Sequence, residues 1–179
     1  MDKPIILIGG TAGTGKTTLA QDLCSKLQID HRLGTGFIRE IIRSQTTPQQ
    51  EPSLFEYTFR ANDPIIHFVY QSERIYGAIN ACINRVKREG TSLIIEGNHL
   101  IPSLYSNLDV NLYLVLSAPD LETHMKQLQG TTHVTRILNS NDVQNIRCIG
   151  DYLKRECNRL SIPYLPYPRT INDILRLIK

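Results

Sequence analysis

A glycine-rich segment near the start of the chain has the residue types and spacing of a phosphate-binding loop. Between Gly10 and Thr17 the sequence fits the pattern G-x-x-x-x-G-K-[ST] at every fixed position. Glycines at this spacing let the backbone curl around a phosphate and point several N–H groups at it. Lys16 is a candidate catalytic residue that can reach the β- and γ-phosphates of a nucleotide, and the Thr17 hydroxyl can ligate Mg²⁺. We therefore expect ATP and Mg²⁺ to bind here, through Gly10, Thr11, Ala12, Gly13, Thr14, Gly15, Lys16, Thr17 and Thr18.

Two arginines have the chemistry needed to hold an anionic substrate. Arg39 and Arg43 lie four residues apart in a segment that indicates a helix, so they share one face. Two positive charges at this spacing repel each other unless a bound anion neutralises them. The planar guanidinium group of arginine forms paired hydrogen bonds with phosphate or carboxylate. Glu40 is the alternative partner, in which case this face is merely solvated. Both interpretations stay open, and Arg39 and Arg43 are candidate substrate-binding residues.

An acidic residue ends an apolar run in the middle of the chain. Residues 93–95 are Leu-Ile-Ile, and Glu96 follows them. A carboxylate at the carboxyl end of a buried parallel strand lies where such sheets bind ligands. Glu96 is thus a candidate catalytic residue and metal ligand, able to hold the Mg²⁺ shell or to accept the proton of an attacking hydroxyl. A carboxylate bonded only to loop amides is the alternative. His99 is a further candidate substrate contact. The alternative is a buried histidine whose ring nitrogens form hydrogen bonds within the protein.

The phosphate loop alone does not separate a kinase from a GTPase or a motor. A GTPase would carry an N-K-x-D base-reading motif and a D-x-x-G motif, and neither occurs in the sequence. Motors and larger ATPases have much longer chains than these 179 residues. The length therefore favours a small kinase that closes around its substrate.

A basic stretch in the second half of the chain has the character of a lid. Small kinases cover the transferring phosphoryl group with a mobile segment that carries arginine. Residues 131–136 lie between two expected helices and end in Arg136, which we choose as the catalytic cation of the lid. Arg147 is the second choice, and a charged surface loop is the alternative interpretation.

Alternating strands and helices must position these residues. Continuously apolar runs such as residues 5–8 are typical of strands buried on both faces, as in a parallel sheet. Strands are expected at 4–8, 30–33, 92–95, 110–116 and 162–165. Helices are expected at 16–27, 37–43, 64–89, 120–128 and 142–160, with a last one after Thr170, while residues 44–63 carry one short helix at most. The pattern predicts an α/β fold, a five-stranded parallel sheet with helices on both faces. We expect a single domain over residues 1–179, with a helical substrate-binding insert at about 36–90 and a short lid at about 129–141.

Composition argues against several other classes of protein. Lys and Arg total 20 and Asp and Glu total 17, and a net charge of +3 is too mild to predict a nucleic-acid or membrane surface. The four cysteines form no C-x-x-C pair, which argues against zinc and disulfides and for a reducing compartment. No apolar run is long enough for a signal peptide or a membrane span. We expect a cytoplasmic protein with a small anionic substrate and without nucleic-acid or membrane partners, and the oligomeric state stays open.

Taken together, these segments resemble the 2-phosphoglycerate kinase family of P-loop kinases. The matching pieces are residues 9–18, Gly34-Thr35 with residues 38–40 and Arg43, and residues 94–102. The last carries the distinctive Glu-Gly-x-His-x-x-Pro pattern. Residues 145–147 and 151–153, followed by Ile162-Pro163, are similar to the C-terminal signature of the family.

The resemblance implies a P-loop NTPase fold like that of nucleoside-monophosphate kinases and ATP-dependent phosphorylation of 2-phosphoglycerate to 2,3-bisphosphoglycerate. It implies nucleotide contacts at residues 13–18 and substrate contacts at Arg39, Arg43 and His99. One residue departs from the pattern: Gly36 stands where the family commonly has an aspartate that would orient the acceptor hydroxyl. Two alternatives therefore stay open. One is a kinase of another acceptor, such as a nucleoside, a sugar or an aminoacyl-tRNA, and the other is a catalytically inactive nucleotide-binding regulator.

Overall fold

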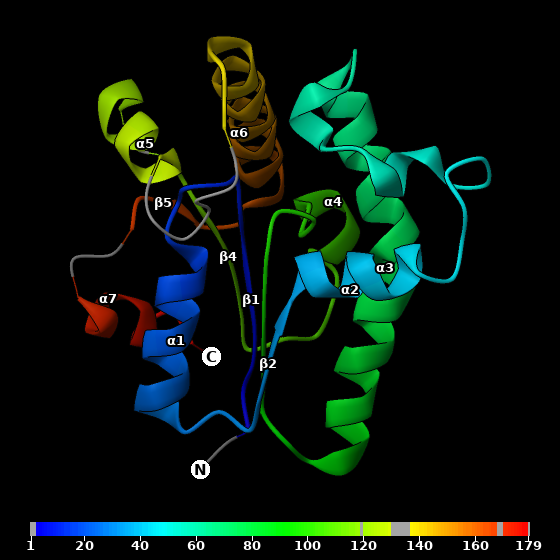
Figure 1. Ribbon diagram of the computed structural model, residues 1–179. Helices are drawn as coiled ribbons and strands as arrows, with labels where there is room; N and C mark the ends of the chain where they lie inside the picture. The colour runs from blue at the N-terminus through cyan, green and yellow to red at the C-terminus, as the bar shows by residue number, and fades with distance from the viewer. Residues whose placement is uncertain (1–2, 119, 130–136, 168–169, 179) are drawn as a thin grey trace.

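A parallel sheet forms the centre of the molecule. The computed structural model describes residues 3–118, 120–129, 137–167 and 170–178, and within these it has five strands in the order β2-β3-β1-β4-β5 (Figure 1). Every neighbouring pair is parallel, which confirms the predicted sheet. The strands are β1 (Ile5–Gly10), β2 (His31–Gly34), β3 (Leu93–Glu96), β4 (Leu112–Leu116) and β5 (Tyr164–Leu165).

Helices cover both faces of the sheet, as the sequence predicts. Side chains of β1 alternate between the two faces: Ile5 and Leu7 join the core beneath α2, α3, α4 and α6, while Ile6 and Ile8 join the core beneath α1 and α7. Figure 1 shows α1 and α7 together on one side of the strands and α2, α3 and α4 on the other. The helices are α1 (Lys16–Leu27), α2 (Thr35–Arg43), α3 (Pro64–Glu89), α4 (Pro102–Tyr105), α5 (Leu121–Leu128), α6 (Ser140–Leu160) and α7 (Ile171–Leu175).

The ends of the two longest helices follow from local chemistry. The Asp63 carboxylate accepts hydrogen bonds from the N–H groups of Ile65 and Ile66, and Gly90 ends α3 in the left-handed conformation at φ 64°. Helix α6 begins two residues before the predicted position because Asn139 caps it, in a reciprocal capping box with Asp142.

The connection between α2 and α3 differs most from expectation. Residues 44–63 contain two 3₁₀ turns, η1 (Pro52–Phe55) and η2 (Thr58–Arg60), rather than one short helix at most. The second turn is held by α6, since Asn145 donates to the Phe59 carbonyl and Arg60 pairs with Asp142. These contacts join distant parts of the chain, so local patterns cannot predict them. None of the helices in the described part of the chain combines the length and apolarity that crossing a membrane requires.

Candidate active site

A pocket of about 670 Å³ opens at the carboxyl ends of β1, β2 and β3. Several segments that are far apart in the sequence line it. The phosphate loop and the start of α1 contribute Gly13, Gly15, Lys16, Thr17 and Thr18, α2 contributes Thr35, Gly36 and Arg39, and the end of β3 with the loop after it contributes Glu96 to His99. Residues of η2, α3 and α5 and Tyr167 also line it. Most of the predicted nucleotide-binding and substrate-binding residues thus meet at one site. Gly10, Thr11 and Thr14 of the phosphate loop do not line the pocket, nor does Arg43.

The phosphate loop has the backbone that phosphate binding requires. Gly15 precedes α1 at φ 84°, and a Cβ at this position would lie 2.5 Å from the Tyr167 ring, so a larger residue is excluded on both counts. Among the described residues, no side chain caps the first turn of α1. The N–H groups at this helix end point toward the pocket side of the loop without a side-chain cap from Gly15, and the helix dipole favours an anion here. The loop residues fit the phosphates of a nucleotide.

Lys16 lies inside the curve of the loop. Its side chain is largely buried, and its Nζ donates a 2.6 Å hydrogen bond to the Thr11 carbonyl. The Thr14 hydroxyl donates to the same carbonyl at 3.0 Å. A charged ammonium is thus held at the centre of the loop by the loop's own backbone.

Glu96 and Thr17 bring two hard oxygen atoms together. Glu96 ends β3, where it is paired in register with Ile8 of β1 and Gly34 of β2. The Thr17 hydroxyl donates to Glu96 Oε1 at 3.1 Å. Hydroxyl and carboxylate oxygens are ligands that Mg²⁺ prefers, and Mg²⁺ normally keeps waters and substrate phosphates as its other ligands. The donor set therefore fits a nucleotide-associated Mg²⁺.

The two arginines of α2 have different environments. Glu40 pairs with both, through Arg39 Nη2 at 2.7 Å and Arg43 Nη2 at 2.5 Å. In the described part of the chain, the pocket wall includes Arg39 but not Arg43, whose guanidinium lies 5.4 Å above the Phe55 ring. Arg39 Nε is buried and meets no hydrogen-bond acceptor among the described residues. Arg39 is therefore the arginine of this pair that an anion in the pocket can reach.

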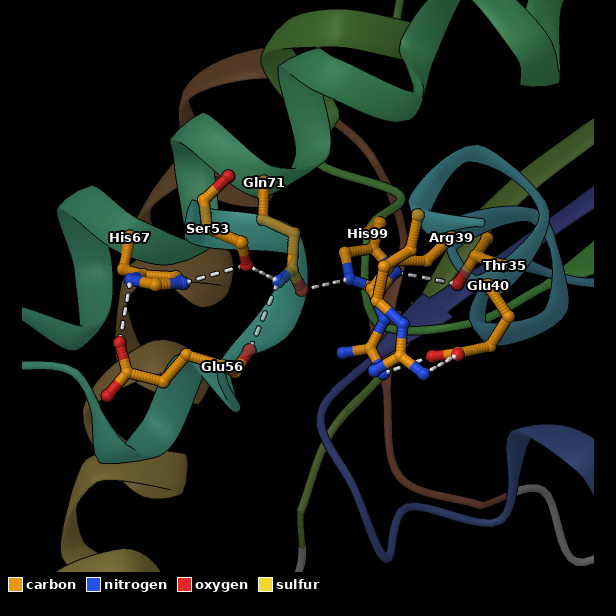
Figure 2. Close-up of polar contacts among 9 residues, drawn as sticks. Thr35, Arg39, Glu40, Ser53, Glu56, His67, Gln71 and His99 are labelled. Atoms are coloured by element: carbon orange, nitrogen blue, oxygen red, sulfur yellow. Dashed lines mark hydrogen bonds and ion pairs between the residues drawn. The ribbon is translucent and has the colours of Figure 1, made fainter. Parts of the chain in front are cut away.

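His99 lies in the pocket wall but is almost fully buried. Its Nδ1 lies 3.0 Å from Thr35 Oγ1 and its Nε2 lies 2.7 Å from Gln71 Oε1 (Figure 2). Burial lowers the pKa of His99 to about 3, and the nearby charges of Arg39 and Lys16 act in the same direction. Both ring nitrogens are thus engaged by the protein itself.

Most residues of the predicted lid lie outside the described part of the chain. Arg136, and with it residues 130–135 of the lid, lies outside the described residues. Arg147, the second choice, donates from Nη1 to His124 Nδ1 at 3.5 Å, and the opposite ring nitrogen of His124 bonds to the Ala12 carbonyl at 2.8 Å. Arg147 therefore contacts the phosphate loop through a buried histidine.

Three residues of the site carry no motif in the sequence. Gln71 is a polar residue beside the apolar stripe of α3, next to buried Ser72, and its burial depends on η1 packing over it. Tyr167 follows β5, lines the pocket beside Gly15 and donates its hydroxyl to Asp22 at 3.0 Å. His124 is fully buried against the loop. For Gln71 the sequence offers only a weak signal, a polar residue next to an apolar stripe.

Comparison with curated proteins finds 2-phosphoglycerate kinases. The chain is 28% identical over 180 residues to the enzyme of Methanopyrus kandleri, covering 90% of this chain and 55% of the relative. It is 31% identical to that of Pyrococcus horikoshii, covering 90% and 58%, and 29% identical to that of Methanocaldococcus jannaschii, covering 97% and 62%. The chain thus spans somewhat more than half the length of these relatives. No protein-family model matches it.

Comparison with solved structures finds P-loop kinases. A shikimate kinase from Acinetobacter baumannii in complex with shikimate superposes with a TM-score of 0.61 at 14% identity, covering 98% of this chain and 92% of that one. A deoxyadenosine kinase from M. mycoides with bound dATP gives a TM-score of 0.53 at 12% identity, covering 97% of each chain. The resemblance expected from the sequence is therefore confirmed: the chain is similar to 2-phosphoglycerate kinases over some nine-tenths of its length, and its fold is that of P-loop kinases.

Proposed function

We propose that this chain is an ATP-dependent kinase that transfers the γ-phosphate to a hydroxyl of a small anionic compound. The observation that carries the proposal is the pocket in which the phosphate loop, Glu96 and Arg39 converge. Similarity to curated 2-phosphoglycerate kinases supports the same reaction class. In this assignment the insert at about 36–90 binds the acceptor, and the lid at about 129–141 supplies Arg136 over the γ-phosphate.

The nucleotide occupies the loop end of the pocket. The amides at the start of α1 bind the phosphates, and Lys16 leaves the Thr11 carbonyl to neutralise charge on the β- and γ-phosphates. Thr17 and Glu96 would hold Mg²⁺, which would supply further charge neutralisation at these phosphates.

The acceptor occupies the α2 end of the pocket. Arg39 binds its anionic group, since Arg39 is the arginine of α2 that lines the pocket. The acceptor hydroxyl forms a bond to the γ-phosphorus while the bond from that phosphorus to the β–γ bridging oxygen breaks, and ADP leaves with the electron pair. The hydroxyl proton passes to Glu96 or to water. Positioning and charge neutralisation dominate such a transfer, so little proton chemistry is required of the protein.

A second candidate function is a kinase of an acceptor other than 2-phosphoglycerate. The observation that favours it is Gly36, which lines the pocket. Apart from the backbone of its own helix and its chain neighbours, no described residue has an atom within 4 Å of the position of a Cβ there. The space that an aspartate would fill is open in this chain. A larger or differently charged acceptor fits this part of the pocket, and the carboxylate expected to orient the hydroxyl of 2-phosphoglycerate is missing.

A coupled ADP-release assay tests both candidates. The wild-type protein is assayed with ATP, Mg²⁺ and a panel of acceptors that contains 2-phosphoglycerate, other phosphorylated acids, sugars and nucleosides. Lys16→Ala is expected to lose turnover by on the order of 10²-fold or more, since it removes a positive charge from the transferring group. Lys26→Ala, at the exposed far end of α1, is the matched control. Unchanged turnover in Lys16→Ala contradicts the site assignment. ATP binding without stimulation by any acceptor favours an inactive regulator.

A further inference from the structure

The side-chain amide of Gln71 has a defined orientation. This residue is fully buried on α3, and one end of its amide hydrogen-bonds the carbonyl oxygens of Ser53 and Glu56, the latter at 3.3 Å. Carbonyl oxygens only accept, so that end must be the NH₂ group. The other end, which faces His99, is therefore the amide oxygen (Figure 2).

The orientation of Gln71 dictates the tautomer of His99. The amide oxygen can only accept, so His99 Nε2, at 2.7 Å, must carry a proton and donate it. His99 is neutral because burial and two neighbouring cations oppose its protonation, so Nδ1 keeps a lone pair. That lone pair accepts the hydrogen bond of the Thr35 hydroxyl at 3.0 Å.

The far end of this chain of hydrogen bonds is the first turn of α2. Thr35 is the first residue of the helix, and Arg39 follows one turn later. The Thr35 hydroxyl also lies against Gly97, where a Cβ would collide with Oγ1, and the Gly97 N–H donates to the Ile8 carbonyl of β1 at 3.0 Å. The start of α2 is thus clamped between the sheet and His99.

The other end of this chain of hydrogen bonds, at Gln71, is bonded to η1, a different part of the acceptor insert. The Ser53 carbonyl accepts from Gln71 and also bonds His67 Nε2 at 3.0 Å, so η1 and α3 are joined at this point (Figure 2). Glu56 adds its carbonyl to Gln71, and its carboxylate lies 3.8 Å from His67 Nδ1. The hydrogen bonds therefore run without a gap from η1 through α3 and the loop after β3 to α2.

We infer that Gln71 and His99 form a neutral bridge of fixed hydrogen-bond polarity that positions α2, and with it Arg39, in the acceptor end of the pocket. Gln71 is a positioning residue, since it acts through His99 and Thr35 rather than on the acceptor. The inference rests on the proposed function only in naming this end of the pocket the acceptor end. It explains why a polar pair lies buried at this site: the bridge orders the insert, which an apolar pair could not do with the same directionality.

Nuclear magnetic resonance tests the bridge without reference to activity. In the ¹⁵N-histidine-labelled wild-type protein, we expect the His99 ring to be protonated at Nε2 alone. A ring protonated at Nδ1 overturns the inference, since Gln71 could then not be its acceptor. This measurement needs no variant and so does not depend on a substitution being tolerated.

A matched pair of variants tests the positioning of Arg39. Gln71→Met keeps the length of the side chain and removes its hydrogen bonds. Ser72→Ala removes an equally buried hydroxyl next to it that donates, among the described residues, to the Phe68 carbonyl of the same helix. We expect the Arg39 Nε–H signal, identified by its loss in Arg39→Lys, to move in Gln71→Met and to stay in place in Ser72→Ala. We also expect KM for the acceptor to rise about tenfold in Gln71→Met, with KM for ATP changed less than about twofold.

The outcomes separate this inference from the proposed function. An unmoved Arg39 signal in folded Gln71→Met overturns the bridge, whether or not an acceptor is known. Equal increases in both KM values overturn it as well, because the effect would then be general. Absence of turnover in a wild-type protein that shows the expected His99 tautomer and Arg39 shift contradicts the proposed function and leaves the bridge supported.

Discussion

The Thr17 hydroxyl lies 3.1 Å from Glu96 Oε1, although 79 residues separate them in the sequence. This contact joins the start of α1 to the end of β3 and brings the two predicted metal ligands together. It exists because β1 and β3 are neighbours in the sheet, with Ile8 paired to Glu96.

The first prediction concerns this pair. Glu96→Gln removes a charged oxygen ligand, so we expect turnover to fall by on the order of 10²-fold and the Mg²⁺ concentration for half-maximal activity to rise. Steady-state rates over a MgCl₂ titration measure both. Glu122→Gln, which changes an exposed side chain of α5, is the control. An unchanged Mg²⁺ titration in Glu96→Gln would show that Glu96 is not in the metal shell.

Arg39 and Arg43 are expected to differ sharply. Arg39→Ala removes the arginine of α2 that lines the pocket, and loss of a charged hydrogen bond should reduce kcat/KM for the acceptor about 10- to 100-fold. Arg43→Ala, outside the pocket wall, should change it only about twofold. Acceptor titrations at saturating ATP measure this difference. Equal losses in the two variants would contradict the assignment of the anion site to Arg39.

Tyr167 is expected to contribute to nucleotide binding. Its ring packs on Gly15 and lines the pocket, so Tyr167→Ala removes apolar surface beside the phosphate loop and should raise the Kd of ATP about tenfold. Tyr167→Phe loses only the hydrogen bond to Asp22 and should bind ATP nearly as well as wild type. Calorimetric titration with ATP compares the two. Weak binding by the phenylalanine variant would mean that the hydroxyl, not the ring, matters.

Gly36→Asp tests the departure from the 2-phosphoglycerate kinase pattern. The position is open to the pocket, and an acidic residue suits the first turn of α2, so the variant should fold with unchanged or slightly raised stability. If the missing acid orients the acceptor hydroxyl, activity with 2-phosphoglycerate should rise about tenfold or more. A fall in activity with this acceptor would instead favour an acceptor that occupies the open space.

The buried neutral state of His99 predicts how stability depends on pH. Its pKa is about 3 in the folded protein against about 6.5 when unfolded, so between these values the unfolded chain binds more protons. The free energy of unfolding should therefore fall as the pH is lowered below about 6.5, by about 2 kcal/mol at pH 5. The pKa of His124 is also lowered by burial and adds to the same trend.

Urea unfolding at pH 7.5 and pH 5 measures this dependence. Carboxylates with lowered pKa, such as Asp120, lose their contribution only near and below their ordinary values, so the two histidines dominate this range. His99→Gln should flatten the dependence. Equal stability of the wild-type protein at the two pH values would contradict the buried neutral assignment.

Much of the fold could be predicted because its signals are local. Helix α1 has the predicted bounds, and α3 begins after Asp63 and ends at Gly90 as predicted, since caps and periodicity act within a few residues. The strands β1, β3 and β4 were also recognisable, because strands buried on both faces are continuously apolar. The two edge strands, β2 and β5, are exposed or half-buried and carry a weaker signal. The four-residue helix α4 and the 3₁₀ turns η1 and η2 depend on what packs against them, and no local pattern predicts them.

The nucleotide end of the site could be predicted from the sequence more fully than the acceptor end. The phosphate loop is one continuous motif, and Glu96 is marked by its place at a strand end, so both were found. The spacing of Arg39 and Arg43 could not show that Glu40 pairs with both or that only Arg39 enters the pocket wall. Gln71 belongs to the site only because η1 folds back over α3, a contact between distant segments.

Transfer of label from [γ-³²P]ATP to an organic acceptor tests the central claim most directly. The proposed function predicts acceptor-dependent label in an organic phosphate ester in the wild-type protein, lost in Lys16→Ala and retained in Lys26→Ala. Label found only in inorganic phosphate, or organic label that persists in Lys16→Ala, would contradict it.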